Sequence, residues 1–480
     1  MERTLIDSID QSYVGKEVKV SGWIVTKRDQ KKIIFIKLAD SWQSRISPLQ
    51  IVFQIAPDES AKYEQLRGAS AGFAVSVTGI VIESPAPEQP YELQAKSYDI
   101  VGKVQNPALY PMSKTDLSLE HYRSFPQLEC FASTKACIYG LRSLLMKATE
   151  EFFDKQHFTK VDMPLLTFSE CEGGCQPMQA TLLLEQESLE SVPIKKDTTK
   201  IDFTKDFFGR KAYLTVSSQL ELETQLPLGN VWTVTRAVRG EPSLTTRHLG
   251  EFTMIELEMQ FISGAVDVMN LSERYIKYCL EYVMKHGQKA LQFLEKKFDK
   301  QLITNLSAYA TEPFVRISHE DAVTLLLKEE KEGRATFGQL PAYDDDMGSD
   351  HERYLTDVIF KKPVIVTHYP QKVKAFYMPV VDPDEEIKHV DSFDILVPDV
   401  GELVGGSARI SDVSELEKRV DELSLSKESL DFYFDLRRNG SIPHGGMGLG
   451  FERLVKFVSG ADSVRDCVPF PRYFRSGKST

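Results

Sequence analysis

Residues 231–259 carry the pattern that most restricts what this chain can fold into: two strand-like runs joined by a polar loop. The first run, residues 231–238, reads VWTVTRAV. The second alternates strictly, with Thr, Ile, Leu and Met at odd positions and, at even positions, Phe252, Met254, Glu256 and Glu258. A period of two is typical of a strand whose two faces meet different surroundings. The segment therefore predicts a β-hairpin with a long loop.

The loop and the even-numbered face of this hairpin bring together cations, carboxylates and an aromatic ring. The candidate residues are Arg239, Glu241, Arg247, His248 and Phe252. Apolar burial does not explain such a face, whereas a site for a nucleotide does, because guanidinium groups pair with phosphate and an aromatic ring can contact a base. A solvated hairpin face with ordinary ion pairs is the alternative.

Length and composition restrict the class of protein. The chain has 480 residues, which suggests two or three domains. Its hydrophobic fraction of 42% and charged fraction of 27% are ordinary for a globular protein. No apolar run approaches the roughly 20 residues that span a bilayer, and the first residues resemble no targeting segment, so the sequence predicts a cytoplasmic protein without a membrane partner. The net charge of −12 disfavours nucleic-acid binding unless basic residues gather locally.

Residues 18–101 predict a small β-barrel. Five short strand patterns, with a helix-like stretch near residues 60–66, are typical of an OB-fold. The basic run at residues 26–32 includes Arg28, and Phe35 follows on the second strand. Basic side chains can follow a phosphate backbone while an aromatic ring stacks on an unpaired base. A basic turn beside a core phenylalanine is the alternative.

Two segments near the C-terminus carry further candidate residues. Residues 392–410 place Asp394 and Glu402 on either side of a turn, and paired carboxylates near a phosphate site suit Mg²⁺. Residues 443–460 contain closely spaced glycines, which let a ligand lie against the backbone. A helix is predicted from about residue 451 to Gly460. Arg453 then falls in the first turn, where the helix dipole favours anions.

Together these segments resemble the class II aminoacyl-tRNA synthetases, and within them the asparaginyl and aspartyl group. The run R-x-E, a loop, T-x-R-H-L-x-E-F and an acidic strand is similar to motif 2, and G-x-G-x-E-R-L around Arg453 is similar to motif 3. An apolar stripe predicts a helix over residues 134–158, and KVDMPLL after it predicts a strand; together they resemble motif 1. The stripe consists of Ile138, Leu141, Leu145, Ala148 and Phe152. The resemblance covers about residues 15–473. It implies an α+β chain with an N-terminal OB-fold β-barrel and a catalytic domain whose mainly antiparallel sheet is flanked by helices.

The resemblance also implies a domain organisation. It assigns residues 1–105 to an anticodon-binding OB-fold domain, 106–125 to a linker and 126–480 to the catalytic domain, with an insertion near residues 181–204. In the family, motif 1 builds a dimer interface, so a homodimer is expected. A plain amphipathic helix over a sheet fits the same residues equally well.

The resemblance further assigns ligands to residues. ATP is expected at Arg239, Glu241, Arg247, His248, Phe252, Glu402 and Arg453. Mg²⁺ is expected at Asp394 and Glu402. Asparagine is expected at Glu172, Gln219, Glu223 and Arg409. Anticodon bases are expected at Arg28, Phe35 and Gln50. Arg239 and Arg453 are the implied catalytic residues, because they would neutralise charge while the substrate carboxylate attacks ATP.

The amino acid expected in the pocket follows from two neighbouring positions. Where the aspartyl branch has a lysine, this chain has Leu222, and Glu223 matches a glutamate of the asparaginyl branch that accepts from the substrate amide. The same carboxylate would repel aspartate. The resemblance therefore favours the asparaginyl branch, which forms asparaginyl-adenylate and charges tRNA(Asn). The motif 2 loop departs from the family at Pro242 and Leu244.

Three alternatives stay open at this point. An aspartyl-tRNA synthetase is one. An ammonia-using asparagine synthetase shares the catalytic fold, but it has no use for an anticodon-binding barrel. A non-catalytic RNA-binding paralogue is the third, and the retained motif 2 and motif 3 arginines and both metal-binding carboxylates argue against it.

Overall fold

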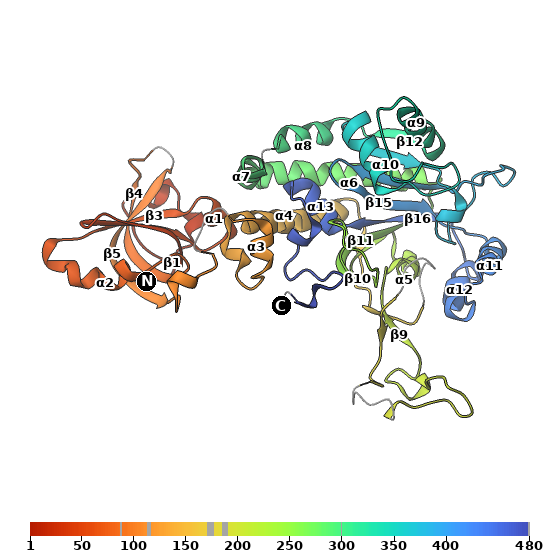
Figure 1. The fold of residues 1–480 in the computed structure, drawn as a ribbon, viewed down its shortest axis with the longest axis horizontal. Helices are drawn as coiled ribbons and strands as arrows, with labels where there is room; N and C mark the ends of the chain where they lie inside the picture. Colours follow the sequence, from red (N-terminus) through yellow and green to blue (C-terminus); the bar gives the residue numbers. More distant parts are fainter. Residues whose placement is uncertain (87–88, 113–116, 170–176, 185–190, 299, 479–480) are drawn as a thin grey trace.

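The computed structural model has a β-barrel at one end and a larger sheet with helices at the other, and one long helix runs between them (Figure 1). The structure describes residues 1–480 except 87–88, 113–116, 170–176, 185–190, 299 and 479–480. Within these described ranges, no helix has both the length and the apolar character required to cross a membrane.

The barrel is closed, with the strand order β1-β2-β3-β5-β4. Its strands are β1 (Glu17–Asp29), β2 (Ile33–Ala39), β3 (Leu49–Gln54), β4 (Ala74–Glu83) and β5 (Tyr91–Gly102). Two short helices, α1 (Trp42–Ile46) and α2 (Glu64–Gly68), connect strands. Alternate residues such as Val20, Ile34 and Ile36 are fully buried inside, because successive side chains of a strand point to opposite faces. The predicted OB-fold barrel is confirmed.

The second body is built on an eight-stranded sheet with the order β12-β13-β14-β15-β16-β11-β10-β6. The strands are β6 (Thr159–Lys160), β10 (Val231–Val238), β11 (Glu251–Gln260), β12 (Val315–Ser318), β13 (Val364–Thr367), β14 (Ser392–Val397), β15 (Gly401–Ala408) and β16 (His444–Gly450). Only the outermost pairs, β12 with β13 and β10 with β6, run parallel. The expectation of a mainly antiparallel sheet is therefore confirmed.

Helices cover one face of this sheet. They are α4 (Ser133–Lys155), α6 (Ala265–His286), α7 (Gln288–Phe298), α8 (Leu302–Thr311) and α13 (Phe451–Ser459). Their apolar side chains and those of the strands form one large core. The stripe predicted on α4 lies in that core: Ile138, Leu141, Leu145, Ala148 and Phe152. The opposite face of the sheet carries the polar residues of the hairpin.

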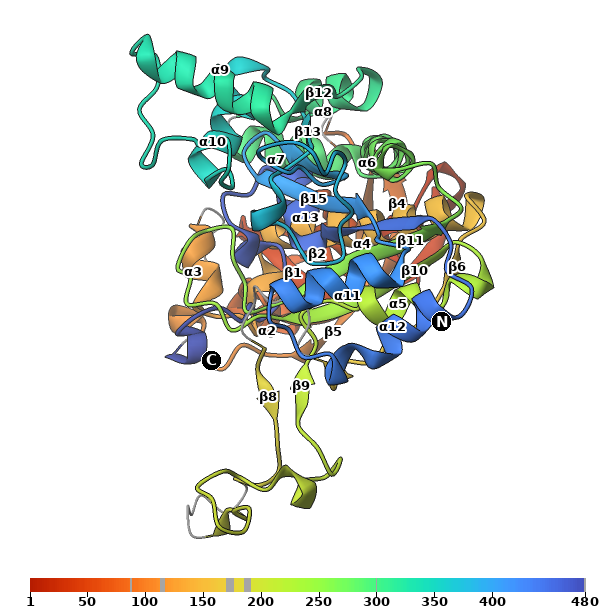
Figure 2. The ribbon, with the colours of Figure 1, turned by 90° about the vertical axis from the view of Figure 1, so that its right-hand side faces the viewer.

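The strand expected after α4 is interrupted. Only β6 (Thr159–Lys160) and β7 (Leu166–Thr167) are strands, and Pro164 lies between them. Proline has no N–H to donate to a ladder, so it ends regular pairing. β7 joins β9 (Ala212–Leu214) and β8 (Gln179–Ala180) in a small sheet, which forms an arm projecting from the molecule (Figure 2). The described residues of the predicted insertion lie beyond β8 in this arm.

The other α-helices described in the larger body lie outside this group. They are α3 (Leu119–Arg123), α5 (Gln219–Glu223), α9 (His319–Lys331), α10 (Ser349–Arg353), α11 (Val413–Glu422) and α12 (Asp431–Arg438). Helices α11 and α12 share a separate apolar cluster with Leu220, Phe376 and Ile410. This cluster supports one side of the second cavity described below.

The barrel is joined to the larger body by packing and by hydrogen bonds. Trp42 of α1 packs so closely on Gly140 of α4 that a Cβ at Gly140 would collide with the indole ring. Nη1 of Arg45, which is buried on α1, donates to the carbonyl of Phe131 at 3.2 Å, and Oγ of Ser133 on α4 donates to the carbonyl of Arg45 at 3.0 Å. Because a buried charge is costly without partners, the hydrogen bond of Arg45 helps to hold the junction.

Candidate active site

The hairpin that dominates the sequence forms as predicted. β10 and β11 pair antiparallel, with Val231 opposite Glu258 and Val238 opposite Glu251. Ile255 and Leu257 are fully buried toward the helices. Phe252, Met254 and Glu256 face the other way and line two adjoining cavities, which share several residues. The even-numbered face is therefore the floor of a site.

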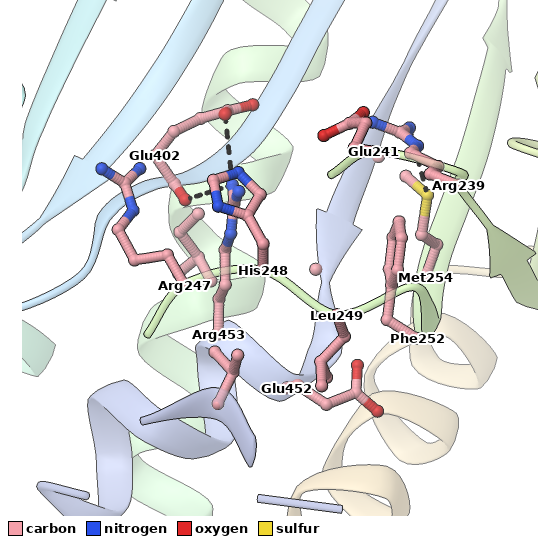
Figure 3. A pocket seen from close by; sticks show the side chains of 14 residues that line it. Arg239, Glu241, Arg247, His248, Leu249, Phe252, Met254, Glu402, Glu452 and Arg453 are labelled. Carbon is pink, nitrogen blue, oxygen red and sulfur yellow. Dashed lines mark hydrogen bonds and ion pairs between the residues drawn. The ribbon is translucent and has the colours of Figure 1, made fainter. Parts of the chain in front are cut away.

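The first cavity has a volume of about 250 Å³ (Figure 3). All the residues expected to contact ATP line it: Arg239, Glu241, Arg247, His248, Phe252, Glu402 and Arg453. They come from the hairpin, from β15 and from the start of α13, so the fold gathers three distant segments here. The solvated-hairpin alternative does not account for this convergence on one enclosed space.

Arg239 lies at the end of β10 against the ring of Phe252. Its guanidinium carbon is 5.3 Å from the ring centroid, which is the distance of a cation–π contact. Both Nε and Nη2 of Arg239 donate to the carbonyl of Val216 at 3.3 Å. The Arg239 side chain is thus held at the boundary between the two cavities, both of which it lines.

Arg453 lies in the first turn of α13, as predicted. The helix starts after Gly450 and ends at Gly460, whose φ of +71° is the left-handed conformation that glycine adopts readily. Nη1 of Arg453 donates to the backbone carbonyl of Glu402 at 2.8 Å and to its Oε2 at 3.1 Å (Figure 3). A helix start and an adjacent guanidinium favour an anion at this position.

Arg247 has a partner that the sequence pattern did not indicate. Its Nη2 donates to Oε2 of Glu352 at 2.8 Å. Glu352 lies on α10, far along the chain, in a segment with no recognisable periodicity or motif, so only the folded structure connects it with the hairpin. Within the described part of the chain, Nε and Nη1 of Arg247 are buried without a hydrogen-bond partner.

His248 lies beside Arg247 and hydrogen-bonds within its own loop. Its Nδ1 is 2.5 Å from Oγ1 of Thr245 and 3.1 Å from Oγ of Ser243. Burial lowers the pKa of His248, and the nearby charge of Arg453 lowers it further. The imidazole is therefore neutral near pH 7, because its ordinary pKa is already about 6.5.

Asp394 and Glu402 converge over the backbone of one glycine. A Cβ at Gly405 would lie 3.3 Å from Oε1 of Glu402 and 3.4 Å from Oδ1 of Asp394. Nζ of Lys374 donates to Oδ2 of Asp394 at 2.6 Å. Burial and the neighbouring Glu402 raise the pKa of Asp394, although Lys374 opposes them. Burial would also raise the pKa of Glu402, but Arg453 and Lys374 outweigh it and lower that pKa to about 2.

This pair of carboxylates fits a hard divalent cation. Carboxylate oxygens are the protein ligands that Mg²⁺ prefers, and Mg²⁺ is usually held by one or two of them together with substrate phosphates. Among the described residues, no group of three or more His, Cys, Asp or Glu side chains could hold a metal. Asp394 and Glu402 would therefore bind the cation together with a ligand in the first cavity.

The second cavity, about 470 Å³, is lined by two of the residues expected to bind asparagine, Gln219 and Arg409. Glu172, also expected there, lies outside the described residues. Glu223 does not line the cavity; it lies behind Gln219 and is almost fully buried. Gln219 is held at both ends of its amide, because its Oε1 accepts from Tyr377 at 2.8 Å and its Nε2 donates to Glu223 at 3.1 Å.

Glu223 is enclosed by donors. Its Oε1 accepts from the Tyr433 hydroxyl at 2.9 Å, and its Oε2 accepts from Nη2 of Arg437 at 2.8 Å and is 2.9 Å from Nε2 of His444. Burial alone would raise the pKa of Glu223, but Arg437, His444 and Arg409 outweigh it and hold that pKa well below its usual range. The carboxylate is therefore ionised.

The leucine next to Glu223 has a different environment from the one expected. Leu222 is fully buried in an apolar cluster with Leu226 and Val231, and it is not among the residues that line the cavity. The absence of a lysine at this position therefore says little about the charge inside the cavity. The side chains that contact Glu223 decide this charge instead, and three of them, Tyr433, Arg437 and His444, were not identified from the sequence.

The residues expected to contact an anticodon share the outer face of the barrel. Arg28 on β1 pairs with Phe35 on β2, and Lys37 pairs with Gln50 on β3. Paired residues and residues two apart on a strand point to the same side. Phe35 is half-buried outside the barrel, between the core residues Ile34 and Ile36. The core-phenylalanine alternative is therefore wrong.

Comparison with known proteins identifies both bodies. The family described as tRNA synthetases class II (D, K and N) matches residues 124–473, and the OB-fold nucleic acid binding domain family matches residues 18–101. An asparagine–tRNA ligase of Porphyromonas gingivalis is 39% identical over 475 residues, which are 98% of each chain. One of Acetivibrio thermocellus is 37% identical and is covered completely.

Solved structures agree in fold. The structure of asparaginyl-tRNA synthetase from Pyrococcus horikoshii complexed with asparaginyl-adenylate superposes with a TM-score of 0.82, at 29% identity and 98% coverage of both chains. An aspartyl-tRNA synthetase from Entamoeba histolytica has a TM-score of 0.74 at 20% identity, covering 98% of this chain and 92% of its own. The second similarity concerns the fold alone.

Proposed function

This chain belongs to the class II tRNA synthetases (D, K and N), and from that membership and its full-length relatives we infer that it is an asparagine–tRNA ligase. The observation that carries the inference further is the pair of adjoining cavities. One is lined by every residue expected at ATP, and the other by Gln219 and Arg409. A nucleotide and an amino acid bound in them would meet at Arg239.

The reaction consists of two steps. First, a carboxylate oxygen of asparagine attacks the α-phosphorus of ATP, the bond from that phosphorus to the bridging oxygen breaks, and pyrophosphate leaves. A hydroxyl of the terminal tRNA ribose then attacks the carbonyl carbon of the adenylate, and AMP leaves. The nucleophile of the first step is already ionised, so the protein contributes positioning and charge neutralisation. We assign the neutralisation to Arg239 and Arg453.

ATP would occupy the first cavity. Phe252 offers a ring face to the base, and Arg453 combines a guanidinium with a helix start near the phosphates. Asp394 and Glu402 would hold Mg²⁺ beside the phosphates; the bound ion supplies neutralisation of the developing negative charge. The convergence of both carboxylates over Gly405 supports this assignment.

Asparagine would occupy the second cavity. Arg409 and Gln219 reach it directly, and Arg409 would contact the side-chain carbonyl. From the resemblance we assign the recognition of the amide to Glu223, which lies behind Gln219 and not on the cavity wall, and Glu172 to the α-ammonium. The enclosure of Glu223 by Arg437 and His444 keeps it ionised, which favours a ligand with an N–H donor over a second carboxylate. This disfavours an aspartyl-tRNA synthetase.

The barrel would bind the anticodon of tRNA(Asn). Arg28, Phe35 and Gln50 share its outer face, where a ring, a cation and an amide can stack on, neutralise and hydrogen-bond to unpaired nucleotides. An ammonia-using asparagine synthetase would have no use for this face. A non-catalytic paralogue would not need Arg239, Arg453 and both carboxylates in one site.

We further propose a homodimer in the cytoplasm. Among the residues that the structure describes, β6 is the last strand of the large sheet and pairs with β10 alone, and exposed strand edges readily pair with another chain. The segment from α4 to β6 resembles motif 1, the family's interface. We also propose the domain limits expected from the sequence, with the barrel at residues 1–105, a linker at 106–125 and the catalytic domain at 126–480.

Pyrophosphate exchange tests the function directly. The purified chain with ATP, Mg²⁺ and labelled pyrophosphate should form labelled ATP when asparagine is added, and much less when aspartate is added. Charging of tRNA(Asn) should follow. Exchange with aspartate alone would indicate an aspartyl-tRNA synthetase, and exchange without charging of any tRNA would favour the asparagine synthetase alternative. No exchange with either amino acid would favour the paralogue.

A further inference from the structure

Glu352 joins the two residues that border the phosphate end of the first cavity. We propose that Glu352 is a positioning residue that aims Arg247 at the terminal phosphates of ATP and keeps that guanidinium away from Glu402. The proposal rests on the proposed function, because it assumes that ATP binds in the first cavity. Glu352 itself does not line this cavity, so it acts through Arg247 and Glu402.

One oxygen of Glu352 makes both contacts. Oε2 accepts from Nη2 of Arg247 at 2.8 Å and from the backbone N–H of Glu402 at 3.1 Å. The two side chains of the ion pair are shielded, with 12% of Arg247 and 14% of Glu352 exposed. A charge-assisted hydrogen bond in such a setting holds its geometry more firmly than an exposed pair does.

The close approach of these groups is built into the backbone. Gly401 has a φ of +83°, and a Cβ there would collide with Oε2 of Glu352 and lie 2.9 Å from Nη2 of Arg247. Position 401 therefore requires glycine for two separate reasons, its backbone conformation and the space that the ion pair occupies. An ion pair formed by chance at the surface would not need a neighbouring residue without a side chain.

Arg247 has donor groups that no described protein group satisfies. Its Nε and Nη1 are buried and have no hydrogen-bond partner in the part of the chain that the structure describes. Buried donors are normally satisfied, so two such donors at a cavity wall indicate a bound acceptor. A guanidinium group suits the oxygens of a phosphate, and Arg247 lies next to Glu402, the expected metal ligand (Figure 3).

Glu402 gives the reason why Arg247 needs a partner of its own. Arg453 already donates to the carbonyl and to Oε2 of Glu402. If Glu352 were absent, the nearest carboxylate for Arg247 would be Glu402 as well. Two guanidinium groups on one carboxylate would leave it little capacity for a cation, and Arg247 would no longer face the cavity. Glu352 prevents this by holding Arg247 from the opposite side.

The test compares two nucleotides that differ in the terminal phosphates. Binding of ATP and of AMP is measured by calorimetry with Mg²⁺ and without amino acid, for the full chain and for Glu352→Ala. The expected result is a loss of ATP affinity of roughly 10- to 100-fold, the effect of losing one well-oriented charged hydrogen bond, with AMP affinity unchanged. Glu352→Gln keeps an acceptor oxygen and should lose less.

Glu273→Ala is the matched control. Glu273 also accepts from an arginine, Arg316, at 3.0 Å and from a backbone N–H, that of Phe314, at 3.1 Å, but it lines neither cavity. This variant should leave the ATP-to-AMP affinity ratio unchanged. In an Arg247→Ala background, Glu352→Ala should cause no further loss of ATP affinity, because Glu352 acts through Arg247.

Several outcomes would overturn the proposal: an equal loss of ATP and AMP affinity, unchanged ATP affinity, or an additive loss in the double variant. In pyrophosphate exchange, the KM for ATP should rise while the KM for asparagine stays constant. Failure of the proposed function would give a different result. The wild-type chain would then show no pyrophosphate exchange with asparagine or with aspartate, whatever the nucleotide affinities of the Glu352 variants.

Discussion

Nη2 of Arg409 donates to Oε1 of Glu258 at 2.6 Å, and both side chains are almost fully buried. The Nε of Arg409 lies 3.6 Å from Oε1 of Glu223, so this guanidinium stands between two carboxylates. Burial and the charge of Glu223 raise the pKa of Glu258 to about 7, although Arg409 opposes them. A substrate carboxylate would add a further negative charge to a region that already holds two.

Glu223→Gln should change the choice between the two amino acids. We expect asparagine activity to fall strongly, while aspartate activity falls less or rises, because the like-charge repulsion disappears. A site that hydrogen-bonds a donor can reject an analogue lacking it by roughly 10⁴–10⁵, so the change in ratio should be large. The measurement is the ratio of kcat/KM for asparagine and aspartate in pyrophosphate exchange.

The control for this prediction is Glu221→Gln on the same short helix. Glu221 accepts from Thr167 at 2.8 Å, whereas Glu223 accepts from Gln219, which lines the cavity, so the Glu221 variant should keep the normal ratio. A normal ratio in Glu223→Gln as well would mean that Glu223 does not read the substrate side chain.

Arg453→Ala should abolish adenylate formation and leave the fold intact. Arg453 combines a position at a helix start with two hydrogen bonds to Glu402. Losing a preorganised donor to developing charge costs about 2.7–4 kcal/mol, or a rate factor of roughly 10²–10³. Pyrophosphate exchange and the thermal unfolding midpoint are measured together. Arg438→Ala, which removes an exposed arginine of α12, is the control and should keep full activity.

Phe35→Ala should weaken tRNA charging and spare tRNA-free adenylate formation. Stacking on one base contributes about 1–3 kcal/mol, so the KM for tRNA should rise by roughly 5- to 150-fold. Phe53→Ala is the contrast, because Phe53 is fully buried in the barrel core and its loss should lower the unfolding midpoint. If Phe35→Ala also lowered that midpoint and reduced both activities equally, the ring would have a structural role only.

Acid should destabilise the chain through His319. This residue is fully buried beside Tyr369, and burial lowers its pKa to about 4. The His319 imidazole is therefore protonated near pH 6.5 in the unfolded chain, but only near pH 4 in the folded chain. The free energy of unfolding is therefore unaffected by the titration of His319 above pH 6.5 and decreases as the pH falls from 6.5 toward 4.

His319→Phe should remove that part of the pH dependence. The free energy of unfolding is measured with urea at pH 7.5 and at pH 5. Between these two pH values it should fall by about 1–2 kcal/mol more in the wild-type chain than in the variant. His286→Phe, at an exposed position at the end of α6, should behave like the unchanged chain. An equal loss in His319→Phe would place the acid sensitivity elsewhere.

Much of the fold was predictable because its signals are local. The alternation of residues 252–259 predicts β11, and the apolar stripe from Ile138 to Phe152 predicts α4, since each pattern follows from one element meeting one core. The strand after α4 was predicted too long, because Pro164 interrupts pairing that a residue-by-residue pattern suggests. The limits of the domains and the roles of the site residues stay predictions.

The site was only partly predictable because several members carry no local signal. Arg239, Arg247 and Arg453 stand in recognisable runs, so the amino-acid sequence alone identifies them as candidates. It does not identify Glu352, which lies on a short helix without a pattern, or Glu258, which is one of several carboxylates on an acidic strand. Their contacts form only in the folded chain, where α10 and β15 pack beside the hairpin.

The junction around α4 has a consequence for size selection. This helix has 23 residues and is about 34 Å long at 1.5 Å per residue; its first turns contact the barrel through Ser133 and Gly140. Because one straight helix connects the two bodies, the distance between the barrel and the cavities is fixed. An RNA that binds both must therefore present two contact regions at that same separation. An RNA with a different separation could reach the barrel or the cavities, but not both at once.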